Sequence, residues 1–328
     1  MIIDRYISYV QNIKRYSPRT ASLYEEALRR YVRVTFATDD VDDQSLISSL
    51  NLSEIRSYEV CLMDKDKLSP KTVRMHLSAL SSFCRYLVKE GLLPSNPVRL
   101  LPKPKVEKRL PQYYRKDSMD TYFTNTAINA SEEYLEEFLK IPHTRPGRKL
   151  YEDRLSRLII SFLYGTGLRR SELISLNVGD IDFGRKVVKV VGKGNKMREI
   201  PMIVSLCEEI LLYLEAVGAL TDGKRSLKSP LLMTYSGNRL YPAYVDRTVK
   251  RELGDVKGIT GRRSPHVLRH SLATELMNEE ADLNSIKEML GHSSLATTQV
   301  YTHSSFARLK NIYEHAHPRA KNGGKHGD

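Results

Sequence analysis

The sequence predicts a mainly helical protein of two domains, the second of which contains a small antiparallel β-sheet. Apolar residues recur at helical spacing through residues 1–100 and again through much of the second half of the chain. A proline-rich basic segment, residues 101–111, separates these regions and cannot continue a helix. Two β-branched runs around a Gly-Lys turn, residues 186–201, predict one β-hairpin.

Composition narrows the classes of protein that are compatible with the chain. Its 328 residues suffice for two domains of ordinary size. The net charge of +13 indicates a polyanion partner, most simply nucleic acid, although a merely basic soluble protein could carry the same excess. There is no apolar run of membrane-spanning length and no signal-peptide layout, and Cys61, Cys84 and Cys207 lack metal-ligand spacing. We therefore expect a cytoplasmic protein with reduced thiols and no membrane partner.

The N-terminal region is expected to be entirely helical. Ser17 and Ser69 each precede a proline, a basic residue and a threonine, which is typical of a helix N-cap followed by proline at the first helical position. Such starts can be caps alone. They are also good phosphate sites, because the adjacent Arg19 and Lys71, with Arg74 just inside the second helix, add positive charge to the helix N-terminus.

Two glycine-containing turns in the second half present basic side chains. A buried helical run ends at Gly165-Thr166-Gly167, and these glycines permit a tight turn that aims Arg169 at a phosphate. The predicted hairpin turn, residues 192–196, could project an ammonium group into a groove or could be an exposed lysine turn. Lys196 and Arg198 are interpreted as contacts to a DNA backbone or as solvated charge.

The most distinctive stretch lies near the C-terminus. His266 and Arg269 are three residues apart, so they share a face of a helix. A second helical pattern stops at Gly291, which places His292 at a helix end. Tyr301 follows His292 by nine positions. One arginine and two histidines that converge on a tyrosine would form a phosphate site with an oxygen nucleophile.

These motifs resemble the signature of the tyrosine recombinases, the phage-integrase family, and most closely its Xer-type branch. The family carries a His-x-x-Arg, a Leu-Gly-His and a tyrosine nine residues after that histidine. Upstream, GTGLRRSEL, VVGKGNKMREIP and LSALSSFCRYLVKEGLLPSNP resemble the family's arginine motif, its β-hairpin and part of its core-binding domain. The resemblance implies six catalytic residues: Arg169, Lys193, His266, Arg269, His292 and Tyr301.

The resemblance also implies an architecture, a two-domain clamp around duplex DNA. A helical core-binding (SAM-like) domain would span residues 1–100, and the linker, residues 101–111, would track the phosphate backbone with Lys103 and Lys105. The α+β catalytic domain would span residues 112–317, followed by a flexible tail. The span from Pro111 to Arg169 is longer than expected for the branch, and we expect the excess, which includes residues 121–131 and 142–149, to form an inserted surface loop.

The chemistry that the resemblance implies needs no metal and no other cofactor. Arg169 and Arg269 would clamp the nonbridging phosphate oxygens, and Lys193 would protonate the departing 5′ oxygen. His266 would assist deprotonation of Tyr301. The family motif puts the catalytic histidine first, so His270 is interpreted as a packing or supporting residue.

The expected function is site-specific recombination of double-stranded DNA through a 3′-phosphotyrosyl intermediate and a Holliday junction, without ATP. The partners would be paired recombination half-sites and a homo-tetramer, or a hetero-tetramer with a paralogue, associated with the nucleoid when DNA is bound. Integration, inversion and chromosome-dimer resolution all stay open. The alternatives are a relaxing enzyme like the type IB topoisomerases and a catalytically idle DNA-binding protein on the same fold.

Overall fold

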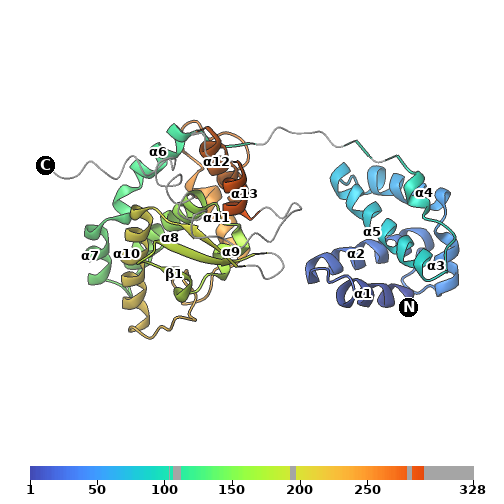
Figure 1. Cartoon of the computed structure of the whole chain (residues 1–328), viewed down its shortest axis with the longest axis horizontal. Coiled ribbons are helices and arrows are strands. Elements are labelled where there is room, and N and C mark those ends of the chain that lie inside the picture. The colour runs from blue at the N-terminus through green and yellow to red at the C-terminus, as the bar shows by residue number, and fades with distance from the viewer. Residues whose placement is uncertain (103, 106–111, 193–196, 279–282, 292–328) are drawn as a thin grey trace. The chain divides into compact units, whose positions relative to one another are not determined.

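The protein is described here by a computed structural model, which covers residues 1–102, 104–105, 112–192, 197–278 and 283–291 (Figure 1). These residues separate into two compact units, one within residues 1–109 and the other within 110–328. The fold class is confirmed: both units are mainly helical, and the second contains a small antiparallel sheet. The proposed domain boundaries and the clamp stay predictions.

The first unit is a bundle of helices around one apolar core. Its elements are α1 (Ile2–Asn12), α2 (Pro18–Phe36), α3 (Asp43–Ser49), α4 (Leu52–Val60), the π-helical turn η1 (Cys61–Lys65), α5 (Pro70–Lys89) and the 3-10 turn η2 (Pro97–Leu100). The two predicted N-caps are present. The Oγ of Ser17 accepts from the Thr20 amide at 3.2 Å, and that of Ser69 from the Thr72 amide at 3.3 Å. Each cap satisfies one amide that the helix leaves unpaired.

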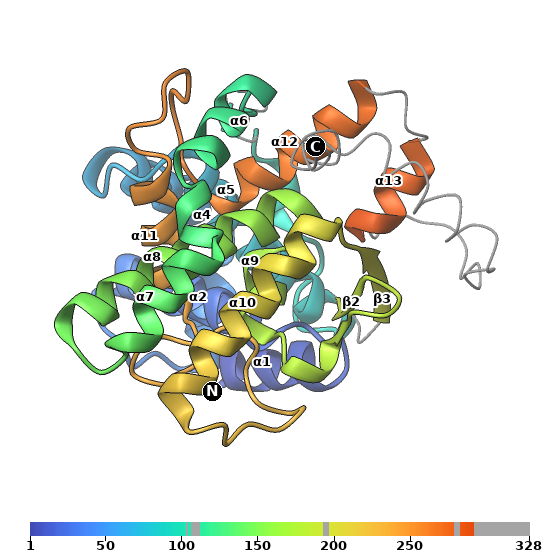
Figure 2. The ribbon, with the colours of Figure 1, turned by 90° about the vertical axis from the view of Figure 1, so that its left-hand side faces the viewer.

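The second unit is built around one long buried helix. Its elements are α6 (Lys116–Asn125), η3 (Ala127–Ala130), α7 (Glu132–Lys140), α8 (Arg145–Thr166), α9 (Arg170–Ser175), η4 (Val178–Asp180), β1 (Ile181–Asp182), β2 (Val187–Val191), β3 (Met197–Pro201), α10 (Val204–Thr221), α11 (Pro242–Glu252), α12 (Pro265–Asn278) and α13 (Leu283–Leu290). Helices α7, α10, α11 and α12 all pack on α8. Figure 2 shows α13 beside α12 and the β2–β3 hairpin, in agreement with their contacts.

The sheet has the order β1-β2-β3 and is antiparallel throughout. Val187 pairs with Pro201 and Val191 with Met197, so the predicted hairpin is confirmed. Its turn, which holds Lys193 and Lys196, lies outside the described residues.

The expected surface loop within residues 112–150 was wrong. The segment forms α6, η3, α7 and the first turn of α8, because its apolar residues recur at helical spacing and are buried against the core. Buried arginines of α8 tie it down. Arg154 donates to the Ser131 carbonyl at 2.7 Å, and Arg157 to the Phe123 carbonyl at 2.8 Å. The segment is therefore an integral part of the second unit.

Within the described part of the chain, no helix is both long and apolar enough to span a bilayer.

Candidate active site

The turn between α8 and α9 places Arg169. Gly167 ends α8 with φ +63°, and a Cβ at this position would come within 2.6 Å of the Leu290 side chain and 3.1 Å of that of Leu272. A residue with a side chain is therefore disfavoured here, because the backbone conformation strains it and its Cβ would displace the Leu290 side chain. Arg169 follows as the N-cap of α9, and its amide donates to Oε2 of Glu172 at 2.8 Å.

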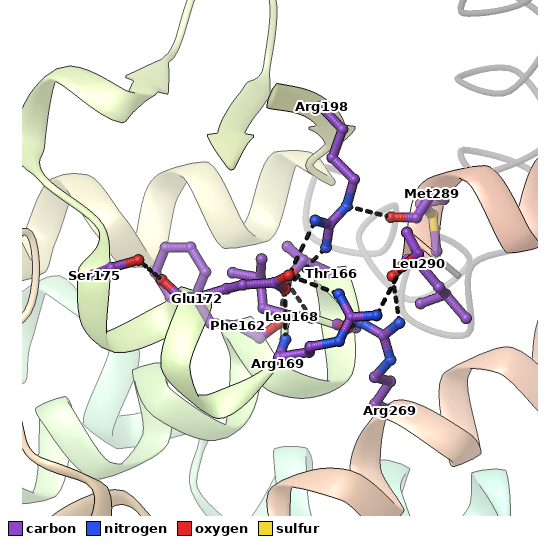
Figure 3. Close-up of polar contacts among 12 residues, drawn as sticks. Phe162, Thr166, Leu168, Arg169, Glu172, Ser175, Arg198, Arg269, Met289 and Leu290 are labelled. Atoms are coloured by element: carbon purple, nitrogen blue, oxygen red, sulfur yellow. Dashed lines mark hydrogen bonds and ion pairs between the residues drawn. The ribbon is translucent and has the colours of Figure 1, made fainter. Parts of the chain in front are cut away.

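Arg169 and Arg269 are brought together, as the motifs predicted, although one is the N-cap of α9 and the other lies within α12. Arg169 donates through Nη1 to Oε1 of Glu172 at 2.8 Å and through Nη2 to the Gly291 carbonyl at 2.7 Å. Arg269 donates through Nη1 to the Gly167 carbonyl at 2.7 Å and through Nη2 to the Leu290 carbonyl. Figure 3 shows the two guanidinium groups side by side at the end of α13. Both are held by the protein before any phosphate binds.

The surroundings of Arg269 disfavour its positive charge. Burial, and then the positive charges of Arg169 and Arg198, lower the pKa of the Arg269 guanidinium to about 10, while Glu172 acts in the opposite direction. A group with this pKa is still protonated at neutral pH. An anion at this position would remove the unfavourable interactions between the cations.

Arg169, His266 and Arg269 line one cavity of about 670 Å³. Its remaining walls are rich in cations, and among the described residues they contain a single carboxylate, that of Asp246, which is paired with Arg170. The other lining residues are Leu168, Lys250, Arg262, Arg263, Ser264 and Pro265. A concave, predominantly cationic surface of this kind suits a phosphodiester.

His266 lies on the exposed face of α12, and the Nε2 atoms of His266 and His270 are 3.0 Å apart. A contact between two ring nitrogens needs one proton, so one ring donates to the other. His270 therefore contacts the predicted catalytic histidine directly, which agrees with its interpretation as a supporting residue.

Arg198 requires a correction. We expected a backbone contact or a solvated charge, but its side chain is only 9% exposed. It donates to both carboxylate oxygens of Glu172, at 3.0 and 2.9 Å, and to the Met289 carbonyl at 2.9 Å. In this position Arg198 faces the interior, and it cannot contact DNA.

Sequence reasoning also missed residues of the cavity wall, among them Arg170, Lys250 and Arg262. Lys250 and Arg262 belong to no motif, and only the packing of α11 and of the segment before α12 brings them to the cavity.

The remaining predicted residues have different outcomes. Lys193, His292 and Tyr301, together with Lys103 and Lys196, lie outside the described residues. Lys105 is exposed. Arg19 and Lys71 are exposed in the first turns of α2 and α5. Arg74 is also exposed and lines a cavity of about 340 Å³ in the first unit, together with Tyr24, Ser78, Ser81, Arg85 and Arg99.

The chain is similar in sequence to two family models and to curated relatives. The phage integrase family matches residues 131–308, and its N-terminal SAM-like domain matches residues 3–91. A tyrosine recombinase XerC from Chlorobaculum parvum is 32% identical over 323 residues, covering 97% of this chain and 94% of the relative. A tyrosine recombinase XerC from Bacillus pumilus is 33% identical and covers 97% of each chain.

Solved structures share the fold. The XerH site-specific recombinase in a post-cleavage complex with difH has a TM-score of 0.64 and 18% identity, over 98% of this chain and 82% of that one. A lambda integrase bound to a COC′ core site has a TM-score of 0.57 and 17% identity, over 92% of this chain and 98% of that one.

Proposed function

The chain belongs to the phage integrase family of tyrosine recombinases, and we propose that Arg169, Arg269 and His266 hold a DNA phosphodiester for attack by Tyr301. The protein is a site-specific recombinase that acts on DNA. One observation carries the proposal for the site: Arg169 from one motif, and His266 and Arg269 from a second motif about 100 residues away, line one cationic cavity. Planar guanidinium groups suit the nonbridging oxygens of a phosphodiester.

The reaction follows from the chemistry of the side chains. The Tyr301 oxygen attacks phosphorus, and its proton passes to His266. The bond from phosphorus to the 5′ oxygen breaks, and Lys193 supplies a proton to that oxygen. Arg169 and Arg269 stabilise the negative charge that grows on the phosphoryl oxygens. His292 donates to one of these oxygens.

The phosphotyrosyl bond conserves the energy of the broken phosphodiester. A 5′ hydroxyl from a second duplex can attack it, which releases Tyr301 and joins the strands without ATP. Two rounds of this exchange pass through a Holliday junction. The positive charge that the reaction needs is supplied by arginine, lysine and histidine side chains, so we expect no metal ion or other cofactor.

DNA contacts in the first unit are proposed at two helix starts and one groove. Arg19 and Lys71 lie beside capped N-termini, where helix amides attract phosphate. Arg74, Arg85 and Arg99 line a common groove, which gives it a strong positive charge. Lys105 would continue the contact along the linker.

Assembly on DNA is proposed to be tetrameric, with protomers on paired half-sites and the C-terminal segment, residues 306–317, docked on a neighbouring protomer. Its apolar residues recur at helical spacing, as expected of a docking helix. The tetramer could include a paralogue, and we place it in the cytoplasm, on the nucleoid. Truncation after Ser305 should weaken cooperative binding to paired half-sites and leave binding to a single half-site unchanged. Loss of single-site binding would instead assign the segment to the protomer's own core.

One experiment tests the proposed function without knowledge of the target. The protein is incubated with fragmented genomic DNA in EDTA without ATP, denatured and stripped of non-covalent DNA, and the attached fragments are sequenced. We expect recovery of one or a few sites with inverted half-sites. A substrate that carries two such sites should then recombine. Relaxation of supercoiled plasmid without strand exchange would favour the topoisomerase-like alternative, and binding without attachment would favour the idle protein.

A further inference from the structure

The C-terminal end of α13 is held by three arginines from three different elements. The carbonyls of Met289, Leu290 and Gly291 are consecutive, and they accept from Arg198 of β3, Arg269 of α12 and Arg169 of α9 respectively. The last carbonyls of a helix have no partner within it, and the helix dipole makes this end negative. The end of α13 is therefore a shared anchor for two arginines of the candidate active site and for a third that does not reach it.

Arg198 joins this anchor to Glu172. Its Nε donates to Met289, while Nη1 and Nη2 donate to the two oxygens of the Glu172 carboxylate at 3.0 and 2.9 Å. The same carboxylate accepts from Nη1 and from the amide of Arg169. Both side chains of the Arg198–Glu172 pair are less than a tenth exposed. Arg198 is thus almost fully buried and is not among the residues that line the cavity. Its guanidinium instead orients Glu172 and the end of α13 (Figure 3).

Gly291 shows how closely this arrangement is packed. Its φ is +65°, and a Cβ would lie within 3.1 to 3.2 Å of three atoms of the Arg198 guanidinium. The absence of a side chain lets the guanidinium lie against the backbone where α13 ends. The turn that leads to His292 is therefore in direct contact with Arg198.

We propose that Arg198 is a positioning residue of the recombinase, and that it fixes Glu172 and the end of α13 so that Arg169 and Arg269 keep their orientation toward the phosphate. This inference rests on the proposed function, in which those two arginines bind the phosphate. Without Arg198, the buried Glu172 carboxylate keeps Arg169 as its one ion-pair partner among the described residues, and the Met289 carbonyl loses the donor that Arg198 supplies. Arg169 would then be drawn toward Glu172 and away from the cavity.

The first test compares Arg198→Met with a matched control, Arg185→Met. Arg185 makes the same two-pronged contact, to Glu199, at 2.9 and 2.6 Å, but on the exposed side of the sheet. We expect Arg198→Met to slow single-turnover formation of the covalent DNA adduct about 10- to 100-fold, by analogy with the loss of residues that orient the ligands of a metal site. Half-site affinity and the Arg185→Met rate should stay near wild type.

The second measurement separates positioning from loss of structure. A substrate whose scissile phosphate carries a methyl group in place of one nonbridging oxygen has no negative charge there, so its cleavage depends less on oriented arginines. We expect the deficit of Arg198→Met to shrink on this substrate, as that of Arg169→Ala should. A general loss of folded protein lowers both rates by the same factor, and that result would contradict the proposal.

Two further variants make the outcome decisive. Should Arg198→Met fail to fold, Arg198→Lys keeps the charge beside Glu172 but cannot form the two-pronged contact and reach Met289 together. For Arg198→Lys, the rate of adduct formation on the ordinary substrate is then divided by the rate on the methyl-substituted substrate. If this ratio equals that of the wild type, the inference is overturned. Arg169→Ala tests the proposed function separately. If Arg169→Ala cleaves normally, the proposed phosphate site is wrong. If only Arg198→Met and Arg198→Lys cleave normally, the site stands and the inference fails.

Discussion

Arg169 and Arg269 donate to adjacent carbonyls at one helix end: Nη2 of Arg169 to Gly291 at 2.7 Å, and Nη2 of Arg269 to Leu290. The two residues are therefore fixed relative to each other by a third element rather than by each other, because two cations repel. Each guanidinium has five N–H donors, so each keeps donors for a ligand. The site is organised before phosphate arrives, which lowers the reorganisation that the reaction requires.

An inorganic anion should stabilise the folded protein by binding here. The cluster of Arg169, Arg198 and Arg269 is balanced by one carboxylate, that of Glu172. Sulfate at ten times its Kd should add about 1.4 kcal/mol to the free energy of unfolding. Thermal unfolding is measured in sulfate and in chloride at equal ionic strength. Sulfate also stabilises every variant in a general way, by favouring burial of the protein surface. The prediction is therefore contradicted if sulfate raises the unfolding temperature of Arg269→Met as much as that of the wild type.

Arg269→Lys should abolish most cleavage although it conserves the charge. A single ammonium group cannot donate to the carbonyls of Gly167 and Leu290 and also present a planar fork to phosphate. We expect a loss of about 100- to 1000-fold in the single-turnover rate, the usual effect of removing one donor to the developing charge. Arg262→Lys, a change on the cavity rim, should cost far less. Equal rates for these two variants would refute the assignment of Arg269.

Glu172 should make stability depend on pH in the acid range. Burial raises the pKa of the Glu172 carboxyl, but hydrogen bonds and charge from Arg198 and Arg169 outweigh burial, so its pKa lies below the ordinary value of 4.5. A carboxyl with a depressed pKa stabilises the folded state above its unfolded pKa, and this contribution is lost as the pH falls through the folded value.

Glu172→Gln is therefore expected to destabilise the protein at pH 7, by about 3 to 5 kcal/mol if the buried arginines are left without a partner. The loss should be smaller in acid, because the wild-type carboxylate is then being protonated. Urea unfolding at pH 7 and pH 4 measures both losses, with Glu199→Gln, at a half-buried carboxylate that pairs with the exposed Arg185, as control. An identical loss at the two pH values would show that the charge of Glu172 is not what stabilises the fold.

Lys193→Ala should be rescued by a substrate in which sulfur replaces the bridging 5′ oxygen. Sulfur is a better leaving group and departs without a proton, so it removes the need for a general acid. The rates of adduct formation on the two substrates are compared in wild type and in the variant. A variant that gains nothing from sulfur would exclude Lys193 as the acid.

The elements that could be predicted from the sequence are those fixed by interactions between residues close together in the chain. Ser17 and Ser69 cap helices through amides three residues away, and the β2–β3 hairpin is fixed by alternation around a short turn. Arg169 and Arg269 could be paired only through resemblance, because they are 100 residues apart and packing alone brings them together.

The errors have physical causes too. Arg198 was assigned to the surface because arginine is usually exposed, yet alternation places it on the same buried face of β3 as Ile200. Its partners, Glu172 and Met289, are distant in sequence and could not be read from the local pattern. The segment that contains α6 and α7 was assigned to a loop by its length, although Tyr122 and Phe138 already indicated buried helices.

The central claim is that Tyr301 is the nucleophile, and trapping the covalent adduct tests it most directly. Wild type, Tyr301→Phe and the control Tyr313→Phe are incubated with a nicked half-site substrate from which cleavage releases the short fragment that carries the new 5′ hydroxyl, and the products are separated under denaturing conditions. We predict that wild type and Tyr313→Phe form a DNA adduct, while Tyr301→Phe forms none and still binds the half-site with wild-type affinity. A denaturant-resistant adduct in the Tyr301→Phe protein would contradict the account.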